Sequence, residues 1–208
     1  MILSFIDINS RFFSYFCKSK QKFKINSLMQ EKQKLTTDRS FPMYVLLDII
    51  TMHIYQAFML SKMSKEINIV AQDGKKTVNY MYLYLCLIGA GLLFGLGFWV
   101  KSMVLYKIAS SIIYILTIIL LIWLFRFSDR IGKELKRREV AYEFGAKSFV
   151  YLFVLPMILG PILGFVLVFL LKSTIIASII LVPVVLFSYV YFYKLIEAVN
   201  RLNKAYNE

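Results

Sequence analysis

Four apolar stretches of about 20 residues each limit what this chain can fold into. They run from Asn79 to Val100, from Met103 to Phe125, from Phe149 to Leu171 and from Thr174 to Tyr193. A helix of that length rises about 30 Å, which matches the hydrocarbon thickness of a bilayer. Because lipid offers the backbone no hydrogen bonds, each stretch is expected to be a transmembrane helix. The predicted fold class is an all-α integral membrane protein.

The four predicted spans are expected to pair into two hairpins, because only two residues separate the members of each pair. Lys101–Ser102 forms the turn of the first hairpin, and Lys172–Ser173 forms the turn of the second. Antiparallel helices joined by turns this short are expected to lie side by side. Both turns are placed on the outer side of the membrane.

The longest inner loop, Arg126–Lys147, lies between the two hairpins. It holds Ile131 and Leu135 four residues apart among charged residues, which is the spacing of one helix face. The third span is therefore expected to continue as a cytoplasmic helical extension. The last span is expected to continue in the same way beyond Lys194.

The stretch Met43–Leu60 is harder to assign. It is apolar on average and helical in pattern, but it contains Asp48 and His53 and is only 18 residues long. A carboxylate at the centre of a membrane costs about 2.5–3.5 kcal/mol. We therefore expect an amphipathic helix that lies in the interface or enters the membrane and returns. A fifth transmembrane helix is the alternative.

The distribution of positive charge favours four spans. If Met43–Leu60 does not cross, 22 of the 25 Lys and Arg residues share one side, and Lys101, Lys107 and Lys172 lie on the other. If it crosses, the split becomes 14 against 11. Cytoplasmic loops carry the excess of Lys and Arg, so both termini are expected in the cytoplasm. The expected location is the plasma (cytoplasmic) membrane.

Two regions are predicted along the chain. Residues 1–42 form a basic, aromatic cytoplasmic tail, either interfacial on an anionic leaflet or poorly ordered, and residues 43–208 form the helical membrane domain. A net charge of +13 is typical of proteins that bind nucleic acid. Here, however, the basic residues flank the apolar stretches and do not form a soluble basic domain. Anionic lipid headgroups are the expected partner, and nucleic acid is not.

Six basic residues of the inner loop are expected to sit just below a span, within reach of the headgroups. Each would contribute attraction toward anionic lipid or toward an acidic partner helix. The plainer interpretation is that these charges only orient the hairpin during insertion. The six residues are Arg126, Arg130, Lys133, Lys136, Arg137 and Arg138.

Small residues indicate where helices approach one another. Gly91 and Gly95 fit the small-xxx-small pattern in the first span, and Gly160 and Gly164 repeat it in the third. Pro156 and Pro161 beside the second pair are expected to kink that helix, since each lacks an N–H. We interpret the glycines as helix-packing positions, including contacts with other membrane proteins or a second copy.

No catalytic, cofactor-binding or metal-binding motif is recognisable. Cys17 and Cys86 are far apart and are expected to be free thiols. His53 follows Asp48 by five residues, about 140° around a helix, so the two are not expected to share a face. We therefore expect no enzymatic activity, no cofactor and no metal.

Several short segments resemble a known family. They are Leu47–Tyr55, Lys62–Asn68, Asp73–Thr77 and the ending Ala198–Asn207. Together they are similar to a bacterial membrane family known as domain of unknown function 4234. The resemblance would cover about Met43 to Asn207, with His53 where that family favours glycine. It implies a small multi-pass membrane protein and brings no activity, ligand or catalytic residue.

The function expected from these features is that of a non-enzymatic scaffold or accessory subunit of a membrane complex. The glycine-bearing spans, the charged inner helices and the lack of catalytic motifs favour it. Two alternatives stay open. One is a permease or channel subunit built around the proline-containing third span, and the other is a membrane immunity protein against an exported toxin.

Overall fold

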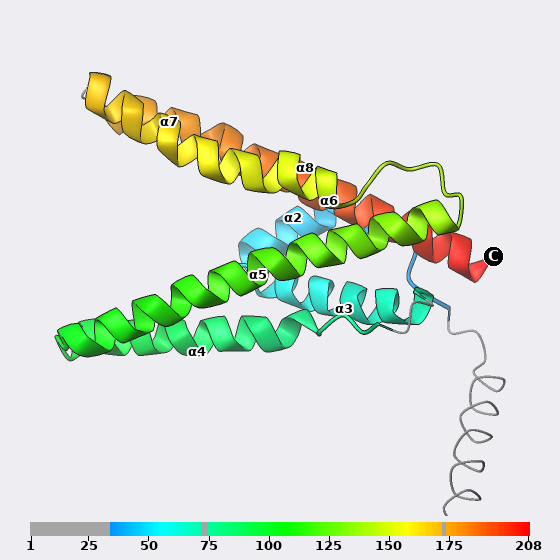
Figure 1. Cartoon of the computed structure of the whole chain (residues 1–208), viewed down its shortest axis with the longest axis horizontal. Helices are drawn as coiled ribbons and strands as arrows, with labels where there is room; N and C mark the ends of the chain where they lie inside the picture. Colours follow the sequence, from blue (N-terminus) through cyan, green and yellow to red (C-terminus); the bar gives the residue numbers. More distant parts are fainter. Residues whose placement is uncertain (1–33, 72–74, 172–173) are drawn as a thin grey trace, which may run out of the picture. The chain divides into compact units, whose positions relative to one another are not determined.

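The computed structural model describes residues 34–71, 75–171 and 174–208. The elements of regular structure in these ranges are helices (Figure 1). Residues 35–206, together with Glu208, form one compact unit. In chain order the elements are α2 (Phe41–Ile50), α3 (Ile54–Val70), α4 (Tyr80–Trp99), α5 (Met103–Arg137), α6 (Ala146–Phe149), the π-helical turn η1 (Val150–Val154), α7 (Leu155–Leu171) and α8 (Thr174–Asn207).

Three helical stretches of the described chain are long and apolar enough to cross a membrane: Tyr80–Trp99, Met103–Arg137 and Ala146–Val166. They correspond to the first three spans expected from the sequence, so an all-helical, membrane-compatible fold is confirmed. The fourth expected span lies within α8, and the turn expected at Lys172–Ser173 falls outside the described residues.

The α4–α5 hairpin has the predicted tight turn. Lys101 adopts a positive φ of 55°, and the Ser102 hydroxyl caps α5 by accepting a hydrogen bond from the Leu105 amide at 3.4 Å. Gly97 allows the two helices to approach, because a Cβ there would lie 2.8 Å from the Tyr106 amide nitrogen. Among Gly89, Gly91, Gly95 and Gly97 of α4, only Gly97 lies at a close approach to a described residue, and the small-xxx-small pattern did not select it.

One of the two predicted helical extensions is correct and the other was assigned to the wrong span. The helix through Ile131 and Leu135 continues the second span and not the third, because Met103–Arg137 is one unbroken helix and the next helix begins only at Ala146. The extension of the last span beyond Lys194 is confirmed. Helix α5 continues without a break from the apolar stretch to Arg137, and α8 continues to Asn207. The buried face of the α5 extension carries Phe127, Ile131 and Leu135 at four-residue intervals, which packs it against α3 and α8. Charged residues cover the outer surfaces of three segments, which we call the polar layer. The segments are α3, Arg126–Arg137 of α5 and Lys194–Asn207 of α8.

The stretch Met43–Leu60 is not the single helix that the sequence predicted. It divides into α2 and α3, because the backbone turns left-handed at Met52 (φ 47°) and His53 (φ 68°). The His53 amide donates to the Asp48 carbonyl at 2.9 Å, and the Met52 amide donates to the Ile49 carbonyl at 3.3 Å. This pair of bonds is a Schellman motif, which ends a helix and is usually built on glycine.

The expected separation of Asp48 and His53 is also wrong. The His53 Nδ1 lies 2.8 Å from the Asp48 Oδ2. The angle of about 140° assumed a continuous helix, whereas the Schellman turn brings the imidazole back over the end of α2. Asp48 is 2% exposed, so the ion pair helps to satisfy a carboxylate that the fold buries.

Helix α2 is short for a membrane crossing. Its ten residues rise about 15 Å, which is half of a hydrocarbon core. The turn between α2 and α3 points toward the same end of the unit as the α4–α5 turn (Figure 1). Ile49, Ile50 and Met52 are exposed at that turn. Apolar side chains therefore cover the turn between α2 and α3, and a re-entrant position in one leaflet stays a prediction.

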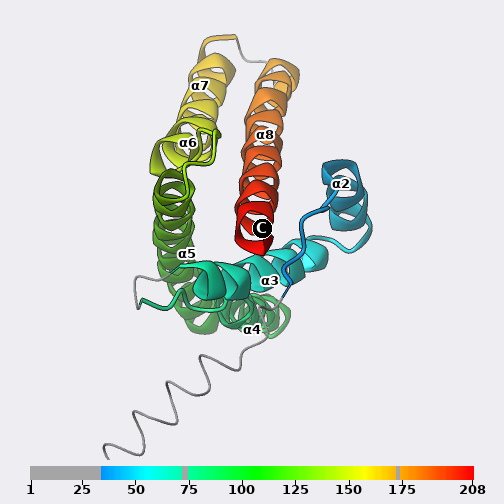
Figure 2. The same cartoon turned by 90° about the vertical axis from the view of Figure 1, so that its right-hand side faces the viewer.

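Helix α8 lies between the α6–α7 segment and α2 (Figure 2), and aromatic rings join it to both. On one side Tyr191 packs against Phe149 and Phe153 of the α6–η1 segment, with ring centroids 5.6 and 5.3 Å apart. On the other side Phe192 packs against Tyr44 of α2 at 5.7 Å. The Tyr191 hydroxyl also lies 2.8 Å from the Ser128 Oγ of α5. Residues Tyr191 and Phe192 thus hold three elements to α8.

The third span contains a π-helical turn close to one of its two prolines, and the kink expected at these prolines stays a prediction. The π-helical turn η1 lies directly before Pro156, and Pro161 lies inside α7. Because proline has no N–H, the carbonyl four residues before it loses its helical partner. A π-helical turn rearranges the hydrogen bonds there and lets the helix continue.

Candidate binding groove

The connection between α3 and α4 is fixed to α5 by one arginine. The Arg130 Nη1 donates to the Asn68 Oδ1 and to the Thr77 Oγ1, both at 2.6 Å, and its Nη2 donates to the Lys75 carbonyl. Asn68 in turn bonds both backbone groups of Thr77, accepting from its amide at 2.7 Å and donating to its carbonyl at 2.9 Å. Arg130 is only 9% exposed, so these bonds form away from water.

Trp123 fixes the other end of the same connection. Its Nε1 donates to the Val78 carbonyl at 2.8 Å. Trp123 precedes Arg130 on α5 by about two helical turns. Its ring packs against Tyr80 at 5.1 Å and stacks on Phe127 at 4.8 Å. Tryptophan is enriched where apolar spans meet the headgroup region, and Trp123 lies where the apolar part of α5 ends.

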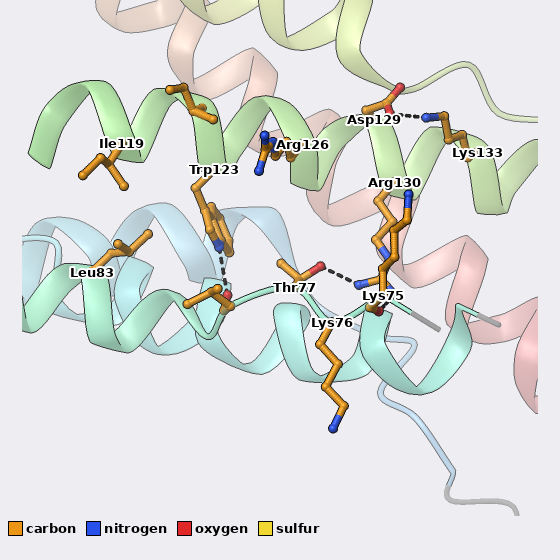
Figure 3. A pocket seen from close by; sticks show the side chains of 12 residues that line it. Lys75, Lys76, Thr77, Leu83, Ile119, Trp123, Arg126, Asp129, Arg130 and Lys133 are labelled. Carbon is orange, nitrogen blue, oxygen red and sulfur yellow. Dashed lines mark hydrogen bonds and ion pairs between the residues drawn. The ribbon is translucent and has the colours of Figure 1, made fainter. Parts of the chain in front are cut away.

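Between these two anchors lies a groove of about 680 Å³ (Figure 3). One wall is the α3–α4 connection with the first turn of α4, and the other is a single face of α5. The groove is lined by Lys75, Lys76, Thr77, Val78, Leu83, Ile119, Ile122, Trp123, Arg126, Asp129, Arg130 and Lys133.

The groove changes from apolar to basic along its length. Leu83, Ile119 and Ile122 line one end, where Ile119 points toward Leu83, and the other end carries Arg126 and Lys133 (Figure 3). The change on α5 takes place between residues 123 and 126, a rise of about 4.5 Å. A hydrocarbon-to-headgroup boundary is the environment that such a steep change fits.

Positive charge dominates the basic end. Five Lys and Arg residues line the groove against one carboxylate, Asp129. Asp129 is paired with Lys133, with 2.6 Å between Oδ2 and Nζ. Arg126 is exposed and lies between Trp123 and Arg130, whereas the side chain of Lys76 points away from α5 (Figure 3). Arg126 is therefore the cation best placed to meet a ligand in the groove.

The six basic residues that the sequence grouped together are divided by the structure. Arg126, Arg130 and Lys133 line the groove, and Lys136 is exposed outside it. Arg137 and Arg138 face the C-terminal end of α3, where both donate to the Val70 carbonyl, at 3.3 and 3.2 Å. Cations at a helix C-terminus stabilise its unpaired carbonyls.

Residues that sequence reasoning did not select complete the groove. Trp123, Asp129 and the Lys75–Val78 connection were not among the predicted contacts. Trp123 could have been selected from the sequence as a groove residue. It ends an apolar stretch and stands three residues before an arginine. The connection gave no such signal, because its position depends on the buried Arg130 contacts.

A second buried polar cluster joins the segment before α2 to α3 and α8. The Arg39 Nη2 lies 2.5 Å from both carboxylate oxygens of Glu66. The Asn203 Nδ2 donates to the Glu66 Oε2 and to the Thr36 carbonyl, both at 2.8 Å, and the Asn200 Nδ2 donates to the Arg39 carbonyl at 2.9 Å. Residues 36–39, at the end of the predicted tail, thus bind the polar layer.

The predicted glycine positions have few neighbours inside the chain. A Cβ added at Gly91, Gly95 or Gly164 would meet nothing within 4 Å in the described part of the chain, and Gly160 is buried. The internal close approaches are instead at Gly97 and at Gly132, where a Cβ would lie 2.5 Å from the Phe144 carbonyl oxygen. Packing of Gly91 and Gly95 against another molecule stays a prediction.

Comparison with known proteins gives one informative result. No curated protein and no solved structure matches the chain. A family match covers residues 39–133, which include the α2–α3 hairpin, α4 and most of α5, and it ends before the predicted Ala198–Asn207 similarity. The match confirms the resemblance predicted from the short segments. Over residues 39–133 the chain carries the domain described as Domain of unknown function (DUF4234).

Proposed function

We propose that this chain is a non-enzymatic scaffold or accessory subunit of a complex in the plasma membrane, with four crossings and both termini in the cytoplasm. The charge distribution supports this orientation, since four spans leave only three of 25 Lys and Arg residues on the outer side. The ten-residue length of α2 supports it as well. Under this arrangement the polar layer lies at the cytoplasmic surface.

The observation that carries the proposal is the polar layer itself. Arg39, Glu66 and Asn203 bind one another across three segments, and Arg130 binds the α3–α4 connection. Buried networks of hydrogen bonds help to hold helices in one arrangement. The layer would therefore fix the spacing of the two hairpins and present a constant surface to a partner.

The outer face of α4 supports contact with another membrane helix. Leu92 and Phe98 are 71% and 75% exposed, and Gly91 and Gly95 have no internal neighbour within 4 Å. Small residues on an exposed span allow a second helix to approach closely. A partner helix packed on Gly91 and Gly95 accounts for this open face.

The test is purification in mild detergent, followed by identification of stably bound membrane proteins. The wild-type protein should retain partners, and a Gly91→Leu/Gly95→Leu double variant should lose them. Gly89→Leu is the matched control, because Gly89 also lies on α4 without a neighbour but points about 200° away from Gly91. Equal loss in both variants, or solute flux by the purified protein alone in liposomes, would contradict the proposal.

A permease or channel subunit is the second candidate, and one observation favours it. The π-helical turn η1 before Pro156 is of a kind that often marks functional positions in membrane helices. Broken or irregular helices house transport sites in several transporter folds. The liposome flux measurement separates this candidate from the scaffold.

A further inference from the structure

We infer that the groove between the α3–α4 connection and α5 binds a single anionic phospholipid of the inner leaflet. The inference rests on the proposed membrane orientation, which places the basic end of the groove at the cytoplasmic headgroups. The phosphate would lie at Arg126, and one acyl chain would follow Ile122, Ile119 and Leu83 toward the membrane centre.

The basic end has the chemistry that a phosphodiester needs. Arg126 offers a planar guanidinium that binds phosphate oxygens in a bidentate way. It is exposed on the groove wall, one helical turn before Arg130, whose own donors bind Asn68, Thr77 and Lys75. Lys133 adds a second cation at this end, although Asp129 offsets part of its charge. The net charge of the lining favours an anion.

The apolar end has the chemistry that a fatty-acid chain needs. Leu83, Ile119 and Ile122 line it, and Ile119 of α5 points toward Leu83 of α4 (Figure 3). Seven residues separate Ile119 from Arg126, a rise of about 10 Å along the helix. A fatty-acyl chain attached to a bound headgroup is long enough to cover that distance.

The combination of the two ends favours a lipid over other anions. A free phosphate ion would fill the basic end and leave the apolar end without a ligand. An acidic protein segment would place its polar backbone against Leu83, Ile119 and Ile122, where the described side chains offer it only carbon atoms. A groove of about 680 Å³ is within the usual size for small-molecule sites.

The test measures lipid retention by native mass spectrometry of the detergent-purified full chain. Three probes are added separately: phosphatidylglycerol, phosphatidylcholine with the same chains, and inorganic phosphate. The wild-type protein should retain one phosphatidylglycerol in preference to phosphatidylcholine. Arg126→Gln should weaken this retention about fivefold, the value of one basic residue near an anionic headgroup.

Two control variants make the result specific. Lys136→Gln removes the same charge from an exposed position of α5 outside the groove, and it should leave retention unchanged. Arg126→Lys keeps the charge and should lose less than Arg126→Gln. If the glutamine variants of residues 126 and 136 lose retention equally, the charge acts without a site and the inference is wrong.

A second pair of variants tests the acyl chain. Ile122→Trp fills the apolar end without changing any charge, and Ile118→Trp adds the same ring to an exposed, lipid-facing position of α5 that does not line the groove. Only the first should reduce phosphatidylglycerol retention. Equal retention by both variants would contradict a chain in the groove.

Each remaining outcome has a definite meaning. Displacement of the lipid by millimolar inorganic phosphate would assign the site to a free anion and overturn the inference, as would equal retention of the two lipids. The measurement does not depend on protein partners. If no protein partner is found but the lipid is retained selectively, only the scaffold proposal is contradicted. If partners are found but the protein does not select phosphatidylglycerol, only the lipid site is contradicted.

Discussion

Arg130 reaches back 62 residues along the chain to place its Nη1 2.6 Å from the Oδ1 of Asn68. Asn68 has already bonded the amide and the carbonyl of Thr77. One guanidinium therefore decides where the α3–α4 connection runs. The Arg130–Asn68 contact also forms one end of the groove. The position of the groove therefore depends on Arg130, although a ligand need not touch that residue.

The first prediction concerns that contact. Arg130→Gln should lower the free energy of unfolding by about 3 kcal/mol, because it removes the hydrogen bonds that the buried guanidinium donates to Asn68, Thr77 and the Lys75 carbonyl. Thermal unfolding in detergent measures the change. Arg126→Gln is the control one turn earlier on α5, where the side chain is exposed, and it should shift the melting temperature little. Similar shifts in both variants would show that Arg130 is not the anchor.

The second prediction concerns Glu66, whose carboxylate binds Arg39 and Asn203 inside the polar layer. Glu66→Gln should cost about 3–5 kcal/mol, since it leaves the Arg39 charge buried without its counter-ion. Glu197→Gln breaks the exposed Glu197–Arg201 pair and should cost less than about 1 kcal/mol. The comparison uses the same chemical change on both residues. A smaller effect at Glu66 than at Glu197 would contradict the role of this cluster.

The third prediction concerns the Schellman turn between α2 and α3. Met52→Gly should raise the stability by about 1 kcal/mol, because glycine adopts a φ of 47° without steric cost. Met52 is 84% exposed, so the change removes little packing. Ile50→Gly, still inside α2, should have the opposite sign and lower the stability by about 1 kcal/mol. If both variants are destabilised, the left-handed turn is not the strained position.

The fourth prediction concerns the one carboxylate in the groove. Asp129→Asn should strengthen retention of phosphatidylglycerol several-fold, since it removes a negative charge from the lining and releases Lys133 from its ion pair. Glu143→Gln removes the same charge from an exposed position outside the groove and should have no effect. Weaker retention after Asp129→Asn would show that the Asp129–Lys133 pair shapes the site and does not merely offset its charge.

Much of the fold follows from patterns within short windows. The lengths of the apolar stretches predicted the spans. The spacing of Ile131 and Leu135 predicted a helix at that position, although this helix continues α5 and not the third span. The two-residue separation at Lys101–Ser102 predicted the tight turn of the first hairpin. In each case the residues that determine the structure are neighbours in the sequence, so periodicity and length are sufficient.

Two features were not predictable in this way. The break after α2 depends on Met52 and His53 adopting left-handed conformations that neither residue prefers, so nothing local marked it except the glycine that the related family has at position 53. The groove depends on Arg130 and Trp123 bonding a connection about 50 residues earlier in the chain. A charge count grouped Arg130, Arg137 and Arg138 with Arg126 and Lys136, although Arg130 binds the α3–α4 connection and both other arginines donate to the Val70 carbonyl.

The central claim is that four spans place both termini and the polar layer on the cytoplasmic side. Cysteine labelling in intact cells with a membrane-impermeant reagent tests it most directly, after Cys17 and Cys86 are changed to serine. Lys101→Cys should be labelled from outside, whereas Gln21→Cys and Asn207→Cys should react only after the membrane is permeabilised. Labelling of Gln21→Cys in intact cells would contradict the claim and establish a fifth crossing through Met43–Leu60.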